Sequence, residues 1–201
     1  MPRREFHPPH LYEADSSYFI TASTVRHQRL FDTDPKRALL HDILRAGAEQ
    51  LGVTLHGWVV LVDHYHLLLD VGSVAPIYRF VKLLHGQSAV CLNRLDATPG
   101  RQVWYQYWDR FPRNEDEFWS YLNYIHINPL KHGYVAVAGA TAPSADRRVS
   151  VTAETSPDVH QALASYPYSS YHHYVQEYGE EFLTDAWLRY PLPDYVEFDG
   201  P

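Results

Sequence analysis

Hydrophobic and polar positions follow two different periods along the chain, and they predict four strands and three helices before residue 132. β-branched and aromatic residues dominate the runs that favour strands, which are residues 18–24, 53–62, 64–71 and 102–107. Aliphatic residues recur at helical spacing over residues 35–51 and 77–93. Asp34 followed by Pro35 predicts the start of the first of these helices, and Gly52 predicts its end.

The helix that the sequence defines best lies between residues 114 and 128. Asn114 followed by Glu117 resembles a capping box, with asparagine in the place of serine or threonine. The apolar residues that follow at helical spacing are Phe118, Tyr121, Leu122 and Ile125. Pro129 lacks the N–H that a helix interior needs, so we expect this helix to end near Asn128.

The order of these elements is strand, helix, strand, strand, helix, strand, and then one more helix. It predicts the α+β class, with a ferredoxin-like β-α-β-β-α-β antiparallel sheet and helices packed on it. The additional C-terminal helix carries Tyr124. We expect it to close over an edge or over the open face of the sheet.

The composition is that of a folded chain. With 201 residues, 45% hydrophobic and 20% charged, the chain can bury a core as one domain, and its composition is not that of a disordered protein. Its single cysteine, Cys91, excludes an intrachain disulfide. No apolar run reaches the roughly 18 residues of a membrane span, and no signal peptide is recognisable. We therefore expect a cytoplasmic protein without a membrane partner.

The net charge of −7 is distributed unevenly along the chain. Residues 1–138 carry 14 basic and 14 acidic side chains, whereas residues 139–201 carry 3 and 10. The neutral first part can still gather its cations on one face and bind phosphates there. We predict a domain over residues 1–138, a flexible loop over 139–165, and an aromatic block with an acidic tail over 166–201 that packs on the domain.

Two pairs of polar residues carry candidate chemistry. His64 and His66 are two apart in a predicted strand, so both imidazoles project from one face and suit a divalent cation. Tyr124 and Asn128 lie one helical turn apart, beside the apolar stripe, and place a phenol near an amide oxygen. Spacing alone also fits a chance histidine pair and a boundary tyrosine. Asp63 fits either a further ligand or a turn residue.

Several blocks of the sequence resemble the single-tyrosine HUH transposases. They are Gly57 to Leu69 (GWVVLVDHYHLLL), Tyr107 to Phe111 (YWDRF) and Tyr124 to Val135 (YIHINPLKHGYV). Tyr166 to Tyr171 (YPYSSY) resembles a C-terminal block of the REP-associated tyrosine transposases, the branch that the sequence resembles most. The chain departs from the family at Val62-Asp63, where Pro-Asn is usual, and at the aromatic Tyr65 between the histidines.

The resemblance implies an enzyme that cleaves and rejoins single-stranded DNA at hairpin or palindromic sequences through a 5′-phosphotyrosine intermediate. It assigns the catalytic tyrosine to Tyr124 and the metal ligands to His64, His66 and Asn128. The implied cofactor is Mg²⁺ or Mn²⁺. The implied partner is single-stranded DNA with REP-like hairpins, bound by a monomer or a homodimer that is associated with the nucleoid.

Two other functions remain open from the residues. One is a metal-dependent nuclease that uses His64, His66 and Asp63 without a covalent intermediate. The other is a catalytically silent protein that binds DNA hairpins. For any of the three, the cations that we expect to contact DNA are Arg79 and Lys82 on the second helix, and Arg110, Arg113 and Lys131 around the tyrosine helix.

Overall fold

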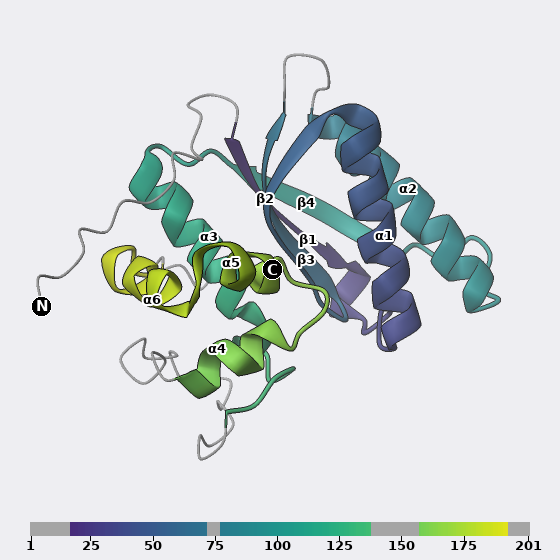
Figure 1. The fold of residues 1–201 in the computed structure, drawn as a ribbon. Helices are drawn as coiled ribbons and strands as arrows, with labels where there is room; N and C mark the ends of the chain where they lie inside the picture. The colour runs from purple at the N-terminus through teal and green to yellow at the C-terminus, as the bar shows by residue number, and fades with distance from the viewer. Residues whose placement is uncertain (1–16, 72–76, 138–156, 193–201) are drawn as a thin grey trace, which may run out of the picture.

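Four antiparallel strands form one sheet, and helices cover both of its faces (Figure 1). The computed structural model describes residues 17–71, 77–137 and 157–192. The strands are β1 (Ser17–Thr24), β2 (Val53–Val60), β3 (His64–Val71) and β4 (Trp104–Arg110). Their order in the sheet is β2-β3-β1-β4, so β1 lies between β3 and the edge strand β4. The predicted α+β class and ferredoxin-like order of elements are confirmed.

The helices divide into two groups, one on each face of the sheet (Figure 1). On one face lie α1 (Asp34–Leu51) and α2 (Ile77–Leu95), which pack against each other. On the other lies α3 (Glu115–Lys131), followed by α4 (Pro157–Ala164), α5 (Tyr171–Tyr178) and α6 (Glu180–Arg189). A short 3-10 helix, η1 (Val25–His27), follows β1. None of the helices in the described ranges is long and apolar enough to cross a membrane.

A glycine lets α3 approach the sheet closely. A Cβ atom at Gly57 in β2 would lie 2.6 Å from Cδ1 of Leu122 on α3, so a larger residue there would force the Leu122 side chain to move. The predicted cap of α3 also forms, because the side chain of Asn114 accepts a hydrogen bond from the Glu117 N–H at 2.9 Å. The carboxylate of Glu117 accepts from the backbone N–H of Arg113 rather than from that of Asn114.

The predicted end of this helix is wrong by three residues, because α3 continues through Pro129 to Lys131. A proline in the last turn removes a single N–H donor, and the donors that follow it still find carbonyls. The N–H groups of His132 and Gly133 bond to the carbonyls of Asn128 and Leu130, each at 3.0 Å. The extra turn keeps Lys131 on the same helix as Tyr124, within reach of its hydroxyl.

The segment predicted as a loop over 139–165 contains a helix. Residues 157–164 form α4, and the rest of the segment up to residue 156 lies outside the described residues. Val159 and Leu163, four positions apart, are buried, and the His160 imidazole bonds to the hydroxyls of Tyr171 and Thr184. Val159 and Leu163 are the only large aliphatic residues between positions 157 and 164, so they alone mark the buried side of the helix.

The aromatic block after α4 packs against β2. The Tyr168 carbonyl accepts from the Val60 N–H and the Ser170 N–H donates to the Trp58 carbonyl, each at 2.9 Å. The hydroxyls of Tyr166 and Tyr174 donate to backbone carbonyls of β2. This segment therefore covers the outer edge of β2. The acidic end of the chain, residues 193–201, lies outside the described residues.

Candidate functional site

The two histidines of β3 lie side by side against α3. His64 and His66 are both buried, and their ring centroids are 5.1 Å apart. Strand geometry gives them a common face because they are two residues apart. That face is the one that α3 covers, since the ring of His66 contacts the ring of Tyr124 from α3 with centroids 5.2 Å apart.

Each imidazole is held through its Nδ1 atom. The Nδ1 of His64 bonds to a carboxylate oxygen of Asp63, and the Nδ1 of His66 bonds to the hydroxyl of Thr21, each at 2.7 Å. An oxygen partner on one ring nitrogen fixes the ring and leaves the other nitrogen as a ligand, which is the usual arrangement of metal-binding histidines. The Nε2 atoms are therefore the nitrogens through which this pair would bind a metal ion.

Asp63 supports His64 from the turn between β2 and β3. Burial acts to raise the pKa of Asp63, but the hydrogen bond with His64 and the nearby imidazoles lower it more, so this carboxyl has a pKa below its ordinary value. The carboxylate also lies 4.0 Å from Nδ1 of His27. Because Asp63 bonds to the Nδ1 side of the imidazole, the geometry fits orientation of His64 better than direct ligation beside Nε2.

Tyr124 is buried, and its hydroxyl is bonded within the same helix. The Lys131 ammonium donates to the Tyr124 Oη at 3.0 Å and lies 4.9 Å from the centroid of the ring. Phe19 of β1 contacts the edge of the ring at a centroid distance of 6.1 Å. A cation therefore sits beside the oxygen that a nucleophilic tyrosine would use.

Asn128 contributes an oxygen to the same region. Its Nδ2 donates to the Tyr124 carbonyl at 3.2 Å, which orients the side-chain amide. Within the described ranges, the Asn128 Oδ1 and the His64 Nε2 are buried and have no hydrogen-bond partner. A buried acceptor without a partner is costly unless something else binds it. Together with the His66 Nε2, these atoms are two nitrogens and one oxygen, the kinds of ligand atom that suit a divalent cation.

This donor set depends on the asparagine. Histidine, cysteine, aspartate and glutamate side chains by themselves form no group of three that could hold a metal in the part of the chain that the structure describes. A metal ion bound here would therefore need the amide oxygen of Asn128 as a third protein ligand. Three protein ligands would leave further positions for water or a phosphate oxygen, as in catalytic metal sites.

Comparison with known proteins places the chain in a family. The family model described as "Transposase IS200 like" matches residues 14–126, which is more than half of the chain and includes His64, His66 and Tyr124. The chain belongs to the IS200-like transposase family. Transposases act on DNA, so this chain belongs to a family of DNA-cleaving enzymes.

The chain is also similar to individual transposases. The transposase is 24% identical to the REP-associated tyrosine transposase of Escherichia coli K12 over 129 residues, which cover 62% of this chain and 72% of the relative. Its fold matches a solved REP-associated tyrosine transposase bound to a REP hairpin, with a TM-score of 0.58 and 17% identity, over 85% of this chain and 86% of the other. A putative transposase from Deinococcus radiodurans is 26% identical, with a TM-score of 0.42 over 52% of this chain and 85% of the other.

The five cations expected to contact DNA are not brought together by the fold. Lys131 lies at Tyr124, and Arg113 precedes α3, where it forms an ion pair with Glu117 at 3.1 Å. Arg110 ends β4 on the side of α3. Arg79 and Lys82 are exposed on α2, on the opposite side of the sheet from α3, where they line a groove with residues of α1.

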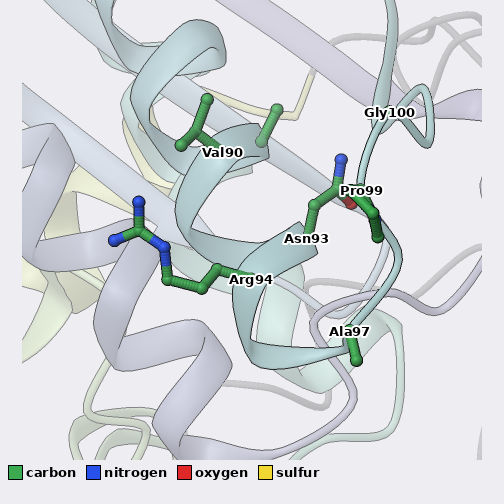
Figure 2. Close-up of a pocket in the computed structure, with 7 residues that line it drawn as sticks. Val90, Asn93, Arg94, Ala97, Pro99 and Gly100 are labelled. Atoms are coloured by element: carbon green, nitrogen blue, oxygen red, sulfur yellow. The ribbon is translucent and has the colours of Figure 1, made fainter.

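A second hollow lies at the C-terminal end of α2 (Figure 2). Val90, Asn93, Arg94, Ala97, Pro99 and Gly100 line it. Asn93 is engaged by the chain itself, because its amide bonds to the carbonyl and to the guanidinium of Arg101. The Arg94 guanidinium extends away from Pro99 and Gly100 (Figure 2). This hollow therefore offers no cluster of chemical groups comparable to that around His64.

Sequence reasoning missed two residues of the site. Thr21 holds His66 because β1 pairs with β3 in a register that sets these two residues opposite each other. His132 lies beside His64, with ring centroids 4.8 Å apart. A period within one strand or helix cannot reveal such neighbours, because both come from pairing and packing between distant segments.

Proposed function

We propose that this transposase cleaves and rejoins single-stranded DNA through a covalent link to Tyr124. The observation that supports this most is the contact of the Tyr124 ring with His66, next to the buried, unsatisfied Nε2 of His64 and Oδ1 of Asn128 described above. A nucleophile thereby lies beside the side chains that would hold a metal ion. Because both come from one chain, the proposal needs no tyrosine from a second subunit.

The proposed step is a transesterification. The Tyr124 Oη attacks the phosphorus of a phosphodiester, the new tyrosine O–P bond forms, and the bond from phosphorus to the 3′-oxygen breaks. The phenolic proton passes to solvent, and the leaving 3′-oxygen takes up a proton to become a hydroxyl. The 5′-phosphotyrosine retains a phosphodiester bond, so a 3′-hydroxyl of another strand can reverse the step without an external energy source.

Several side chains of this protein would prepare the reaction. Lys131 fixes the phenol oxygen and places a positive charge where the attacked phosphate gathers negative charge. Thr21 and Asp63 hold the two imidazoles in fixed orientations. His64, His66 and Asn128 would hold Mg²⁺ or Mn²⁺, which as a Lewis acid polarises the scissile phosphate.

The DNA partner that we propose is a single strand bearing a hairpin. A solved transposase with the same fold was bound to a REP hairpin, and the chain is also related in sequence to a REP-associated enzyme. Cleavage of a single strand fits the buried position of Tyr124, because an unpaired backbone can enter a narrower site than a duplex can. The hairpin would supply the recognisable structure next to the cut.

The test is a search for a covalent conjugate. A single-stranded oligonucleotide with a hairpin and a label at its 3′ end is incubated with the protein and Mg²⁺ or Mn²⁺, then separated under denaturing conditions. We expect a labelled conjugate that maps to Tyr124. Tyr124→Phe should abolish the conjugate without loss of DNA binding, and a chelator should suppress it.

Tyr121→Phe is the matched control, because it removes a phenolic hydroxyl one turn earlier on the same helix. Burial and the Glu117 carboxylate raise the pKa of Tyr121 to about 12, and its ring stacks on Phe19 in the core. This variant should form the conjugate normally. A conjugate of normal yield from Tyr124→Phe would overturn the proposal. Free 5′-phosphate ends without any conjugate would instead favour a hydrolytic nuclease, and binding without cleavage would favour a silent hairpin-binding protein.

A further inference from the structure

The two edges of the sheet differ, and the difference points to the edge strand β4. The outer edge of β2 is covered by the segment around Tyr168. No strand within the described ranges pairs with the outer edge of β4. Helix α3 packs on β2 and β3, which leaves β4 outside its main contacts. Side chains of β4 that point to the α3 side therefore lie outside the part of the sheet that α3 mainly covers.

Strand register places Trp108 on the same face as the histidine pair. Thr21 of β1 is directly opposite His66 on one side and directly opposite Trp108 on the other. Residues directly opposite each other in an antiparallel sheet share a face, and the Thr21 hydroxyl bonds to His66 on that face. His66, Thr21 and Trp108 thus form one row across three strands. Trp108 lies two strand spacings, about 10 Å, from the backbone of His66.

A β-bulge brings a second aromatic ring to this face. Ala22 pairs with Tyr107 and Thr24 pairs with Trp104, so β4 has one residue more than β1 between these two positions. Such bulges redirect side chains and are common beside active sites. Here the Tyr105 ring lies 6.1 Å from the Trp108 ring by centroids, and 52% of Tyr105 is exposed. Trp108 is half-buried, which leaves part of its indole accessible.

A cation completes the surface. Arg110 is directly opposite Phe19, whose ring contacts both His66 and Tyr124, so Arg110 belongs to the same face. Two accessible aromatic rings next to an arginine are the combination with which proteins bind unpaired nucleotides, by base stacking and phosphate attraction. The surface is also continuous with the site through Thr21 and Phe19.

We infer that Tyr105 and Trp108 form a stacking platform for the unpaired bases that flank the scissile phosphate. This inference rests on the proposed function, since it places the strand that Tyr124 would cleave. The occupant is single-stranded DNA, with one or two bases stacked on the rings and the adjoining phosphate near Arg110. Because every base has a π-face, the platform would hold the strand with little sequence preference.

The experiment is a thermodynamic cycle on binding, made in a Tyr124→Phe background so that no cleavage intervenes. Fluorescence anisotropy measures the affinity for a hairpin oligonucleotide whose single-stranded flank is intact or carries abasic nucleotides. Trp108→Ala should weaken binding to the intact flank by roughly tenfold, and the abasic flank should weaken binding to the parent protein similarly. Trp108→Ala combined with the abasic flank should weaken binding little more than either change alone. Trp108→Phe should restore most of the affinity.

Tyr105→Ala is the second variant, because a side chain this exposed can be removed without disturbing the core. Its effect on affinity should likewise be non-additive with that of the abasic flank. Tyr78→Ala is the matched control, because Tyr78 is 53% exposed but lies on α2, across the sheet. The Tyr78→Ala variant should lose as much affinity on the abasic flank as the parent protein does. Additive losses, or unchanged affinity in both platform variants, would overturn the inference.

Two further readouts separate this inference from its alternatives. If Trp108→Ala or Tyr105→Ala converts a dimer into a monomer in sedimentation and leaves the cycle additive, the β4 edge is a protein interface and the inference fails. If the 3′-labelled conjugate at Tyr124 forms while the cycle is additive, the platform is wrong and the proposed function stands. If no conjugate forms under any condition, the proposed function fails whatever the cycle shows.

Discussion

At the scale of single residues, the ammonium of Lys131 has a testable role as a positioning group. It donates to the Tyr124 Oη at 3.0 Å, and it reaches that atom because α3 continues beyond Pro129. Lys131→Met should slow formation of the Tyr124 conjugate roughly tenfold or more, because the phenol loses its hydrogen bond and the site loses a positive charge. Single-turnover rates at saturating DNA, measured beside equilibrium affinities, check this.

Lys131→Arg is the matched variant, because it keeps the charge and a donor and should recover part of the rate. A purely structural lysine would alter the melting temperature of both variants and leave the single-turnover rate of the folded protein unchanged. Equal rates for Lys131→Met and the parent protein would therefore remove Lys131 from the mechanism.

A second residue-scale prediction concerns His85 on α2. Burial lowers the pKa of His85 to about 4 from its ordinary value of 6.5. The ring stacks on Trp104, and its Nε2 is bonded to the Tyr65 hydroxyl at 2.9 Å. Above pH 6.5 neither the folded nor the unfolded state protonates this imidazole. Between pH 6.5 and about 4 the unfolded state binds the proton and the folded state does not, so the free energy of unfolding falls as the pH falls.

The contribution of His85 to this loss is on the order of 2–3 kcal/mol. Urea unfolding at several pH values measures it. His85→Gln should flatten the dependence between pH 6.5 and 4 relative to the parent protein, even if it lowers stability at every pH. Other buried imidazoles such as His126, whose pKa burial lowers to about 3, keep part of the slope in both proteins. An unchanged slope in His85→Gln would show that this imidazole titrates alike in both states.

At the scale of secondary-structure elements, the sequence predicted what depends on local periods and missed what depends on packing. Four strands, their order with the first helices and the Asn114 cap follow from hydrophobic spacing and capping chemistry, and the structure confirms them. The end of α3 was misplaced because proline blocks only one hydrogen bond in a last turn. Helix α4 was missed because only Val159 and Leu163 mark its buried side.

The candidate site shows the same division. His64, His66, Tyr124 and Asn128 came from a spacing of two in a strand, a spacing of four in a helix, and the family resemblance. Their mutual contact was not predictable from any period, because it needs α3 to lie over β3 rather than over β4. Thr21 and Trp108 depend on the register of β1 with both of its neighbours. Register is a property of the assembled sheet, so a single sequence does not reveal it.

At the scale of the whole molecule, the C-terminal block is part of the fold rather than an appendage. Its tyrosine hydroxyls and its backbone form hydrogen bonds with backbone groups of β2. The Asn123 amide of α3 donates to the carbonyls of Ala186 and Tyr190 at the end of α6. Buried contacts of this kind stabilise both partners, because removal of one leaves polar groups of the other without hydrogen bonds. The helix that carries Tyr124 is therefore held from both sides, by the sheet and by this block.

Truncation tests this view. A chain that ends at Ser165 should lose cooperative thermal unfolding, because it exposes the β2 edge and the outer side of α3. A chain that ends at Leu192 keeps every contact just described and should unfold cooperatively. Circular dichroism and calorimetry on both chains measure the difference. A cooperative transition at an unchanged temperature in the Ser165 chain would mean that β1 to α3 fold independently. The position of Tyr124 against His66 would then owe nothing to the block that follows it.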